Sequence, residues 1–254
     1  MKDRLVSVVT TFFNAESTIQ DTILSIANQS YKNIEVIFVD GKSTDKSLKI
    51  VKENAFRFDK IKIISEPDDG IYDGMNKGIL NATGEIIAIL NADDYFDKGA
   101  LQNVMELFVD NVDIVAATLR KVNCNSGSMS SIYRSEIPEL SPFSASIHHP
   151  AVFVTKKLYN EIGLFDSKYK ISADYDFISR AVNANARIIY SDTITTNMRD
   201  GGVSDSLKNH TKKNIEHIRI GFKHIPSLKG RFSHLAHVLK KYIYGLLVYK
   251  GFIK

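Results

Sequence analysis

The sequence predicts an α/β protein in which a mostly parallel sheet is flanked by helices. Short apolar runs rich in β-branched residues alternate with segments of helical periodicity through roughly the first hundred residues. Several of these runs end in an asparagine or an aspartate, which is typical of strands whose carboxyl ends meet at a ligand-binding edge. The 254 residues are 44% hydrophobic, enough for one large domain with or without an appendage.

The first half of the chain repeats a strand, a loop and a helix. A helix is expected to start near Ser17, before an apolar stripe, and a second helix follows the capping segment 43–45. This alternation is typical of a parallel sheet covered on both faces. We expect strands at residues 5–10, 35–40, 61–65 and 85–90, and helices at residues 17–27, from 45 to about 54, at 72–80 and at 98–108.

The alternation is less regular in the second half. Two strands are expected at residues 113–118 and 131–134, around a polar hairpin turn at 123–130. Helices at 156–162 and 174–182, a strand at 187–190, and a polar, glycine-containing loop at 197–206 follow. From Leu207 onward the chain is basic and predicted to be helical. We therefore divide it into a catalytic domain, residues 1–206, and a helical basic appendage, residues 207–254.

The charge distribution indicates where ligands bind. The net charge is +4, with acidic residues clustered between Glu66 and Asp97 and lysine and arginine dominant in the tail. Cys124 is the only cysteine, which excludes an intramolecular disulfide and a cysteine-based zinc site and points to a reducing compartment. The N-terminal apolar run is too short for a signal peptide, and no window approaches the roughly 20 apolar residues of a membrane span. We expect a cytoplasmic protein.

The polar residues that follow the strands are the first candidates for a binding site. They include Asn14, Asp40 and Asp68–Asp69, and the run Asn91-Ala-Asp-Asp94 ends the fourth predicted strand. Carboxylates that converge on one edge repel one another unless a cation lies between them, and oxygen ligands favour Mn²⁺ or Mg²⁺. Alternation would place Asn91 and Asp93 on the same side, facing a ribose and a metal. The alternative, a plain turn and helix cap, explains the same residue types.

Five ordered motifs make the sequence resemble the inverting family 2 glycosyltransferases of the GT-A fold, particularly bacterial enzymes of polysaccharide assembly. The resemblance spans roughly residues 5 to 205. The motifs are Ser7-Val-Val-Thr-Thr-Phe-Phe-Asn14, Val39-Asp-Gly-Lys-Ser-Thr-Asp45, Ser65-Glu-Pro-Asp-Asp-Gly-Ile-Tyr-Asp-Gly-Met-Asn-Lys-Gly78, Leu90-Asn-Ala-Asp-Asp94 and Ser172-Ala-Asp-Tyr-Asp-Phe177.

The resemblance implies a Rossmann-like fold, a UDP-linked sugar donor, and a divalent metal, Mn²⁺ or Mg²⁺. Asp93 is the matching metal ligand, Asp94 adds negative charge, and Asn91 occupies a place that an aspartate often holds. The implied donor contacts comprise a nucleoside pocket of Thr10, Phe12, Asn14, Asp40 and Asp69, and sugar or phosphate contacts from Asp73, Asn76 and Lys77. Two alternatives stay open: Asp40 could serve turn and cap chemistry, and residues 70–78 could be an ordinary amphipathic helix.

Asp174 matches the family's catalytic base, which takes the acceptor's proton in a single displacement. Alanine stands at position 173, where a glutamate is common, and capping of a helix N-terminus is the alternative role for Asp174. His149 is expected to line the acceptor pocket, with a structural histidine as the alternative. Arg199, in a loop expected to fold over the donor, would contact phosphate, with a plain surface turn as the alternative.

The tail interleaves lysine, arginine and histidine with aromatic and aliphatic residues. This pattern suits an interfacial helix that presents a lipid-linked acceptor at the inner face of the cell membrane. It equally suits a helix packed on the catalytic domain or one in a homo-oligomer contact. Nucleic acid is a poor partner for this pattern.

The sequence therefore predicts an inverting, metal-dependent glycosyltransferase that acts on a glycan or lipid-linked acceptor in cell-surface polysaccharide synthesis. A non-catalytic nucleotide-sugar-binding or scaffold protein on the same fold is the alternative, because Asn91 and Ala173 replace common acids. A sugar nucleotidyltransferase is disfavoured, because residues 10–16 contain neither glycine nor a basic residue. A dinucleotide-dependent oxidoreductase is disfavoured because no G-x-G-x-x-G follows the first strand.

Overall fold

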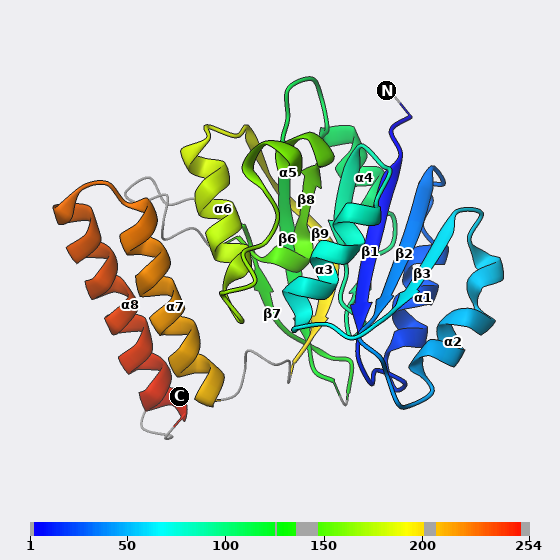
Figure 1. Cartoon of the computed structure of the whole chain (residues 1–254), viewed down its shortest axis with the longest axis horizontal. Helices are drawn as coiled ribbons and strands as arrows, with labels where there is room; N and C mark the ends of the chain where they lie inside the picture. Colours follow the sequence, from blue (N-terminus) through cyan, green and yellow to red (C-terminus); the bar gives the residue numbers. More distant parts are fainter. Residues whose placement is uncertain (1–2, 125, 136–146, 201–206, 250–254) are drawn as a thin grey trace.

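The computed structural model describes residues 3–124, 126–135, 147–200 and 207–249, and forms a curled sheet with helices on both faces (Figure 1). The strands are β1 (Val6–Phe12), β2 (Ile34–Asp40), β3 (Ile61–Ser65), β4 (Ile86–Ile89), β5 (Tyr95–Phe96), β6 (Ile114–Val122), β7 (Met129–Tyr133), β8 (Val152–Thr155) and β9 (Ile188–Arg199). The helices are α1 (Ile19–Ala27), α2 (Ser47–Glu53), α3 (Ile71–Asn81), α4 (Ala100–Leu107), α5 (Lys156–Ile162), α6 (Ala173–Asn183), α7 (Leu207–His224) and α8 (Leu228–Tyr249). The predicted α/β fold is confirmed.

The strand order creates a crevice beside β1. The order is β3-β2-β1-β4-β8-β6-β9-β5, with β7 paired to β6. The first four strands in this order are parallel, and β6 pairs in parallel with β9, whereas β8, β7 and β5 add antiparallel pairs. The chain passes from β1 to β2 and β3 on one side, then crosses to β4 on the other. Ligands of α/β sheets bind at such a switch point, beyond the carboxyl ends of the strands.

The two faces of the sheet bury separate hydrophobic clusters because side chains alternate along each strand. In β1, Val8 packs with α1, α2 and α4, whereas its neighbour Val9 packs with α3. The α3 helix lies very close to β1, since a Cβ added at Gly78 would lie 2.1 Å from Val9 Cγ1. This close packing fixes α3 against the strand that leads to the crevice.

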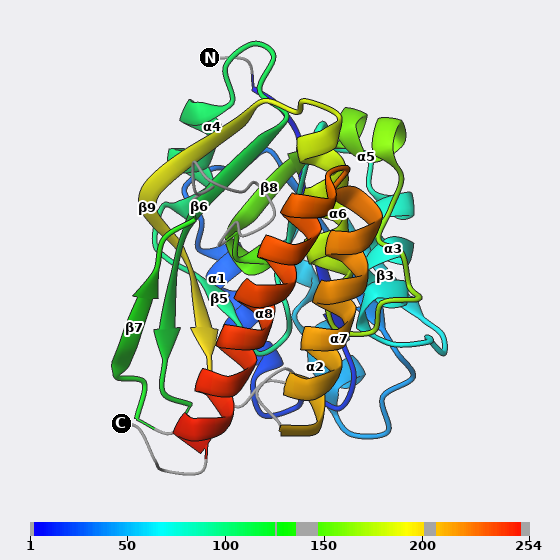
Figure 2. The ribbon, with the colours of Figure 1, turned by 90° about the vertical axis from the view of Figure 1, so that its left-hand side faces the viewer.

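The basic tail forms an antiparallel helical pair beside α6 (Figures 1 and 2). The α7 helix packs on α6, and the fully buried carboxylate of Asp176 in α6 joins them. It accepts hydrogen bonds from Lys223 and His224 of α7, each at 2.9 Å, and from Arg180 at 2.8 Å. Of the roles predicted for the tail, packing on the catalytic domain is therefore the one that the described residues show.

Several element boundaries differ from the sequence-based predictions. The loop predicted at 197–206 is wrong at its start, because β9 continues through Arg199 by pairing with β5 and β6; residues 201–206 lie outside the described part of the chain. The helix expected after residues 43–45 begins at Ser47, because the Asp45 carboxylate accepts the Ser47 backbone N–H at 2.9 Å. The short strand β5 was not predicted. Within the described residues, no helix is long and apolar enough to cross a membrane.

We predict that Gly78→Ala destabilises the protein by about 1–3 kcal/mol, because the new methyl group would overlap the Val9 side chain in a packed interface. Urea unfolding followed by circular dichroism measures the change. Leu80→Ala is the matched control on the same helix, since Leu80 is 70% exposed, and it should alter the free energy of unfolding by less than about 0.5 kcal/mol. Equal stability of Gly78→Ala and wild type would contradict this packing.

Candidate active site

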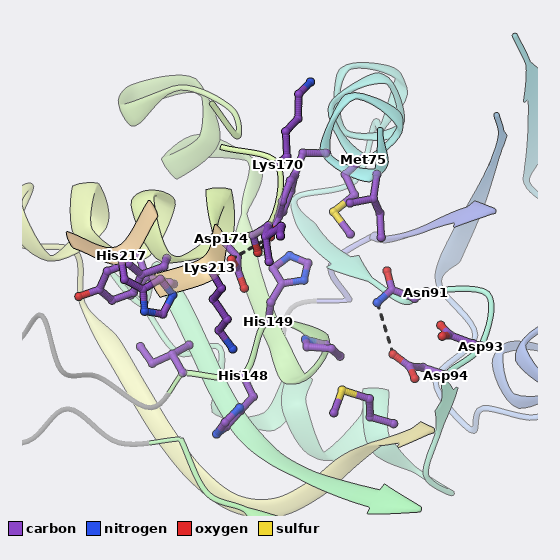
Figure 3. A pocket seen from close by; sticks show the side chains of 18 of the residues that line it. Met75, Asn91, Asp93, Asp94, His148, His149, Lys170, Asp174, Lys213 and His217 are labelled. Atoms are coloured by element: carbon purple, nitrogen blue, oxygen red, sulfur yellow. Dashed lines mark hydrogen bonds between the residues drawn. The ribbon is translucent and has the colours of Figure 1, made fainter. Parts of the chain in front are cut away.

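A pocket of about 420 Å³ lies beside the turn that follows β4. Its walls come from α3, the β4–β5 turn, the segment before β8, the start of α6, the end of β9 and both tail helices. In Figure 3 the acidic turn lies on one side and the tail residues on the other. The polar and charged side chains of the lining include Tyr72, Asn91, Asp93, Asp94, His148, His149, Lys170, Asp174, Tyr175, Arg199, Lys213, His217 and Lys241.

The Asn91–Asp94 run is a turn held in place by hydrogen bonds. The Asp94 N–H donates to the Asn91 carbonyl at 3.0 Å, and Asn91 Nδ2 donates to Asp94 Oδ2 at 3.4 Å. Thr22 of α1 donates to the carbonyl oxygens of Ala92 and Asp94, at 3.0 and 2.7 Å. The expectation of strand-like alternation here is wrong, because β4 ends at Ile89. The turn nevertheless directs Asn91, Asp93 and Asp94 to the pocket, so it serves as turn and as pocket wall.

Too little positive charge lies near the carboxylates of Asp93 and Asp94 to balance their negative charge. Burial, followed by the charge of Asp93, raises the pKa of Asp94 well above its usual range. Burial also raises the pKa of Asp93, and the Arg199 charge opposes that rise. The Oδ1 atom of Asn91 is buried without a hydrogen-bond partner. A buried acid, a half-buried acid beside it and an unpaired amide oxygen suit a bound cation.

A divalent metal fits this donor set only if a ligand completes its shell. The described residues contain no group of three or more His, Cys, Asp or Glu side chains arranged to hold a metal ion. Mg²⁺ and similar ions are commonly bound by one or two carboxylates together with substrate phosphates. The turn therefore suits a metal that arrives with a diphosphate.

Arg199 ends β9 and contacts the acidic turn. The backbone N–H of Arg199 donates to Asp94 Oδ1 at 3.2 Å, and the guanidinium donates to the Asp93 carbonyl oxygen at 2.6 Å. The guanidinium also pairs with Asp21 and lies 5.0 Å from the centre of the Tyr95 ring. Arg199 thus closes one side of the turn from a strand, and not from the loop in which the sequence placed it.

Asp174 lies in the first turn of α6 and lines the same pocket. The Tyr72 hydroxyl lies 2.9 Å from Asp174 Oδ1 and 3.0 Å from the Ile171 carbonyl oxygen, so it donates to both. Burial, followed by the Asp174 charge, raises the pKa of Tyr72 well above its usual range, which keeps the hydroxyl protonated as a donor. The interaction holds the Asp174 carboxylate toward the pocket.

Glu216 of α7 fixes the segment that leads to Asp174. Its buried carboxylate accepts the backbone N–H groups of Lys170, Ile171 and Ser172, at 3.0, 3.0 and 2.9 Å. These donors immediately precede α6. Sequence reasoning missed this residue, although one signal was present: Glu216 is the only acidic residue after position 206.

The histidines of the pocket are held in the neutral form. Burial lowers the pKa of His149, whose ring packs edge-on at 5.3 Å against the Phe165 ring. Burial and the Lys213 charge lower the pKa of His148. Burial, followed by the Lys213 charge, lowers the pKa of His217 to about 3, and the His217 ring stacks on Tyr175 at 4.5 Å. His149 lines the pocket and also packs in the aromatic core, which fits both the predicted role and its structural alternative.

A second polar group lies at the carboxyl ends of β1 and β2. Asp40 is fully buried, and its two oxygens accept the Ser43 N–H at 2.8 Å and the Ser65 hydroxyl at 2.7 Å. Asn14, with a φ of 50°, accepts the Thr44 N–H at 2.9 Å. The hydroxyl of Thr10 is buried without a partner. Asp40 thus makes the turn contacts that were its alternative role, and each of its oxygens keeps a second lone pair for a ligand. Asn14 and Thr10 lie with it at the edge of the crevice.

Asp68 was a weaker candidate than Asp69 in the sequence, yet the structure places it closer to this group. A Cβ added at Gly41, directly after Asp40, would lie 2.6 Å from Asp68 Oδ2. Asp69 instead donates its N–H to Asp73 and accepts the Lys170 ammonium at its carbonyl oxygen, at 3.1 and 3.0 Å.

The structure does not bring the other predicted donor contacts into the pocket lining. Phe12 is in the core, with its ring 6.5 Å from that of Phe38. The Asn76 amide exchanges hydrogen bonds with the backbone of Phe165, at 2.9 and 3.0 Å. Asp73 and Lys77 form an ion pair at 3.2 Å. These contacts give all four side chains structural partners.

Two solved structures share the fold of this chain. S. aureus TarS 1-349, solved in complex with UDP-GlcNAc, is 20% identical to this chain. The match covers 92% of this chain and 71% of the TarS chain, with a TM-score of 0.70. The mannosyltransferase PcManGT from Pyrobaculum calidifontis, solved in complex with GDP-Man and Mn²⁺, is 18% identical, with coverages of 94% and 70% and a TM-score of 0.67. The fold is thus that of the GT-A glycosyltransferases.

Sequence comparison gives the family. The profile described as Glycosyl transferase family 2 matches residues 7–172. A PGL/p-HBAD biosynthesis glycosyltransferase of Mycobacterium bovis is 27% identical over 89% of this chain and 90% of its own length. A Haemophilus influenzae protein named only as an uncharacterized glycosyltransferase is 27% identical over 81% and 69%. The chain belongs to glycosyltransferase family 2.

We predict that Glu216→Ala lowers the free energy of unfolding by about 2–4 kcal/mol, because buried N–H groups lose their acceptor. Chemical denaturation measures the change. Glu161→Ala is the matched control, since Glu161 is exposed and pairs with Lys157 at 3.5 Å, and it should cost less than about 0.5 kcal/mol. Similar losses in both variants would contradict the role of Glu216.

Proposed function

We propose that this protein is an inverting glycosyltransferase that moves a sugar from a nucleoside diphosphate sugar, UDP-linked, to a glycan or lipid-linked acceptor in cell-surface polysaccharide synthesis. One observation carries the proposal: Asp174 lines the same pocket as the acidic turn Asn91–Asp94 (Figure 3). A base and a metal-binding edge that can stabilise the departing diphosphate, both in one pocket, are what a single displacement at an anomeric carbon requires.

The donor would lie along the crevice from β2 to the acidic turn. Asp40, Asn14 and Asp68 supply acceptors for the N–H and hydroxyl groups of a nucleoside at one end. Membership of family 2, and the nucleotide sugars bound in TarS and PcManGT, support a donor of this class. The choice of UDP rests on the TarS complexes, which contain UDP and UDP-GlcNAc.

Asp93, with Asp94 and the unpaired Asn91 Oδ1 beside it, would hold Mn²⁺ or Mg²⁺. The bound metal would neutralise the charge that develops on the departing nucleoside diphosphate. Burial raises the pKa of both carboxyl groups, which supports this assignment because a bound cation would stabilise their charged forms. The Mn²⁺ present in the PcManGT structure also supports it.

Asp174 would act as the base. The acceptor hydroxyl oxygen attacks the anomeric carbon, the bond from that carbon to the diphosphate oxygen breaks, and the hydroxyl proton passes to Asp174. The sugar is transferred with inversion because the two oxygens occupy opposite faces of the anomeric carbon. Tyr72 orients the carboxylate, and Glu216 holds the backbone ahead of it.

The tail would hold the enzyme at the inner face of the cell membrane. Four large apolar side chains of α8, spaced by four or seven residues, are exposed on one helical face. They are Leu228, Phe232, Leu239 and Ile243, with exposures of 70, 67, 44 and 56%. Lysine and arginine side chains of the same helix would meet anionic headgroups.

We predict that UDP binds in a metal-dependent manner and that Asp93→Ala removes this dependence. Without the carboxylate, Mn²⁺ loses a protein ligand, so the Kd for UDP should rise about tenfold or more, to the value measured with chelator. Calorimetric titration with Mn²⁺ and with EDTA measures both. Metal-independent UDP binding by the wild-type protein would contradict the proposed metal site.

We predict that Asp174→Asn keeps the donor affinity and lowers transfer by about 10²–10⁴-fold, because the acceptor proton loses its base. UDP release from UDP-sugars, measured with a bacterial lipid and glycan extract as acceptor, reports transfer. Asp192→Asn is the control of equal charge change, since the Asp192 side chain is 85% exposed. Unchanged transfer by Asp174→Asn would remove Asp174 as the base, and donor binding without any transfer by the wild-type protein would favour the non-catalytic alternative.

A further inference from the structure

The end of the pocket formed by the tail carries two lysines that have no counter-ion among the described residues. Lys213 of α7 and Lys241 of α8 both line the pocket, and no ion pair or hydrogen bond within the described part of the chain uses either ammonium group. In Figure 3 the Lys213 side chain extends from α7 toward the space between His217 and His149. The other cations of the lining have partners: Lys170 donates to the Asp69 carbonyl, and Arg199 pairs with Asp21.

Within the described residues, neither Glu216 nor Asp174 forms an ion pair with these two lysines. Both oxygens of Glu216 are used by backbone N–H groups, and Asp174 accepts the Tyr72 hydroxyl. Asp93 and Asp94 line the pocket from the β4–β5 turn, on the side away from the tail (Figure 3). Within the described residues, Lys213 and Lys241 therefore bring positive charge to the tail end of the pocket, whereas the Asn91–Asp94 turn brings negative charge.

The remaining polar groups at the tail end are neutral hydrogen-bonding groups. Burial, followed by the charge of Lys213, lowers the pKa values of His148 and His217, so these imidazoles stay uncharged near neutral pH. A neutral imidazole can still donate one N–H. Two ammonium groups with neighbouring N–H donors form the environment in which phosphate or carboxylate oxygens bind.

We propose that the tail end of the pocket is an anion-binding subsite for the acceptor, and that the acceptor carries a phosphate or carboxylate group recognised by Lys213 and Lys241. This inference rests on the proposed transferase function, and it names the substrate class. A neutral acceptor would displace water from the two ammonium groups without compensation, which costs free energy. An anionic acceptor instead neutralises them and is held with its hydroxyl beside Asp174.

The subsite is distinct from the proposed donor site in residues and in charge. The donor diphosphate would approach the carboxylates of the acidic turn together with its metal. The acceptor anion would bind directly to lysines that come only from the tail. This arrangement also gives α7 and α8 a role in choosing the acceptor, in addition to packing on α6.

Calorimetry of the full chain, saturated with UDP and Mn²⁺, tests the subsite with glucose 6-phosphate, glucuronate and glucose as probes. We expect at least one of the two anions to bind and glucose not to bind. Lys213→Gln/Lys241→Gln should weaken anion binding at least tenfold. The matched control is Lys212→Gln/Lys240→Gln, which removes the same charge from adjacent, exposed positions outside the lining and should leave binding unchanged.

Several results would overturn the proposal. They are glucose binding as tightly as the anions, equal losses in the two double variants, and no anion binding at millimolar concentrations. Binding to phosphatidylglycerol vesicles that depends on Lys213 and Lys241, without binding of either sugar anion, would place a membrane contact there instead. UDP affinity is measured in the same samples. If UDP does not bind, the proposed function fails while the anion titration without UDP still decides whether the subsite exists.

Discussion

The carboxylate of Glu216 joins the two parts of the protein on which the active site depends. It is buried where α7 meets α6, and it satisfies backbone N–H groups that would otherwise be left unpaired at the start of α6. Because these donors lie just before Asp174 in the chain, the docking of α7 on α6 also fixes the position of the proposed base. The tail is part of the pocket wall as well as an extension of the catalytic domain.

The opposite wall depends on an electrostatic imbalance. The turn after β4 buries Asp94 beside Asp93. The Arg199 guanidinium already pairs with Asp21 and donates to the Asp93 carbonyl oxygen. Such a turn is costly without a cation, and a metal that arrives with a diphosphate would remove the cost only when the donor is bound. The positive end of the pocket lies beyond Asp174, so the charges of the pocket differ between the proposed donor and acceptor sides.

The sequence predicts the parts of the site that depend on local pattern. Strand ends and motif order indicate the fold, the crevice and the positions of Asp40, Asp93 and Asp174. Side-chain direction follows less directly: Phe12 shares the even-numbered face of β1 with Val8 and therefore packs in the core. The motif that contains Phe12 therefore predicts a donor contact, although the alternation of side chains along β1 directs Phe12 into the core.

Contacts between distant elements could not be predicted. Glu216 is separated by more than forty residues from the N–H groups it accepts, so no local pattern links them. Lys213 and Lys241 reach the pocket only because α7 docks on α6 with α8 beside it. The amphipathic pattern of the tail is equally compatible with a membrane surface, a partner and this packing. Burial of Asp176, with its hydrogen-bond partners Arg180, Lys223 and His224, accompanies the third.

The most direct test of the central claim, that one pocket gathers the donor and the base, is a crystal structure of the full chain with UDP and Mn²⁺. We expect the uridine at Asp40 and Asn14, the metal on Asp93, and the diphosphate facing Asp174 across the pocket. A nucleotide whose diphosphate lies on Lys213 and Lys241, with no metal at the acidic turn, would contradict it.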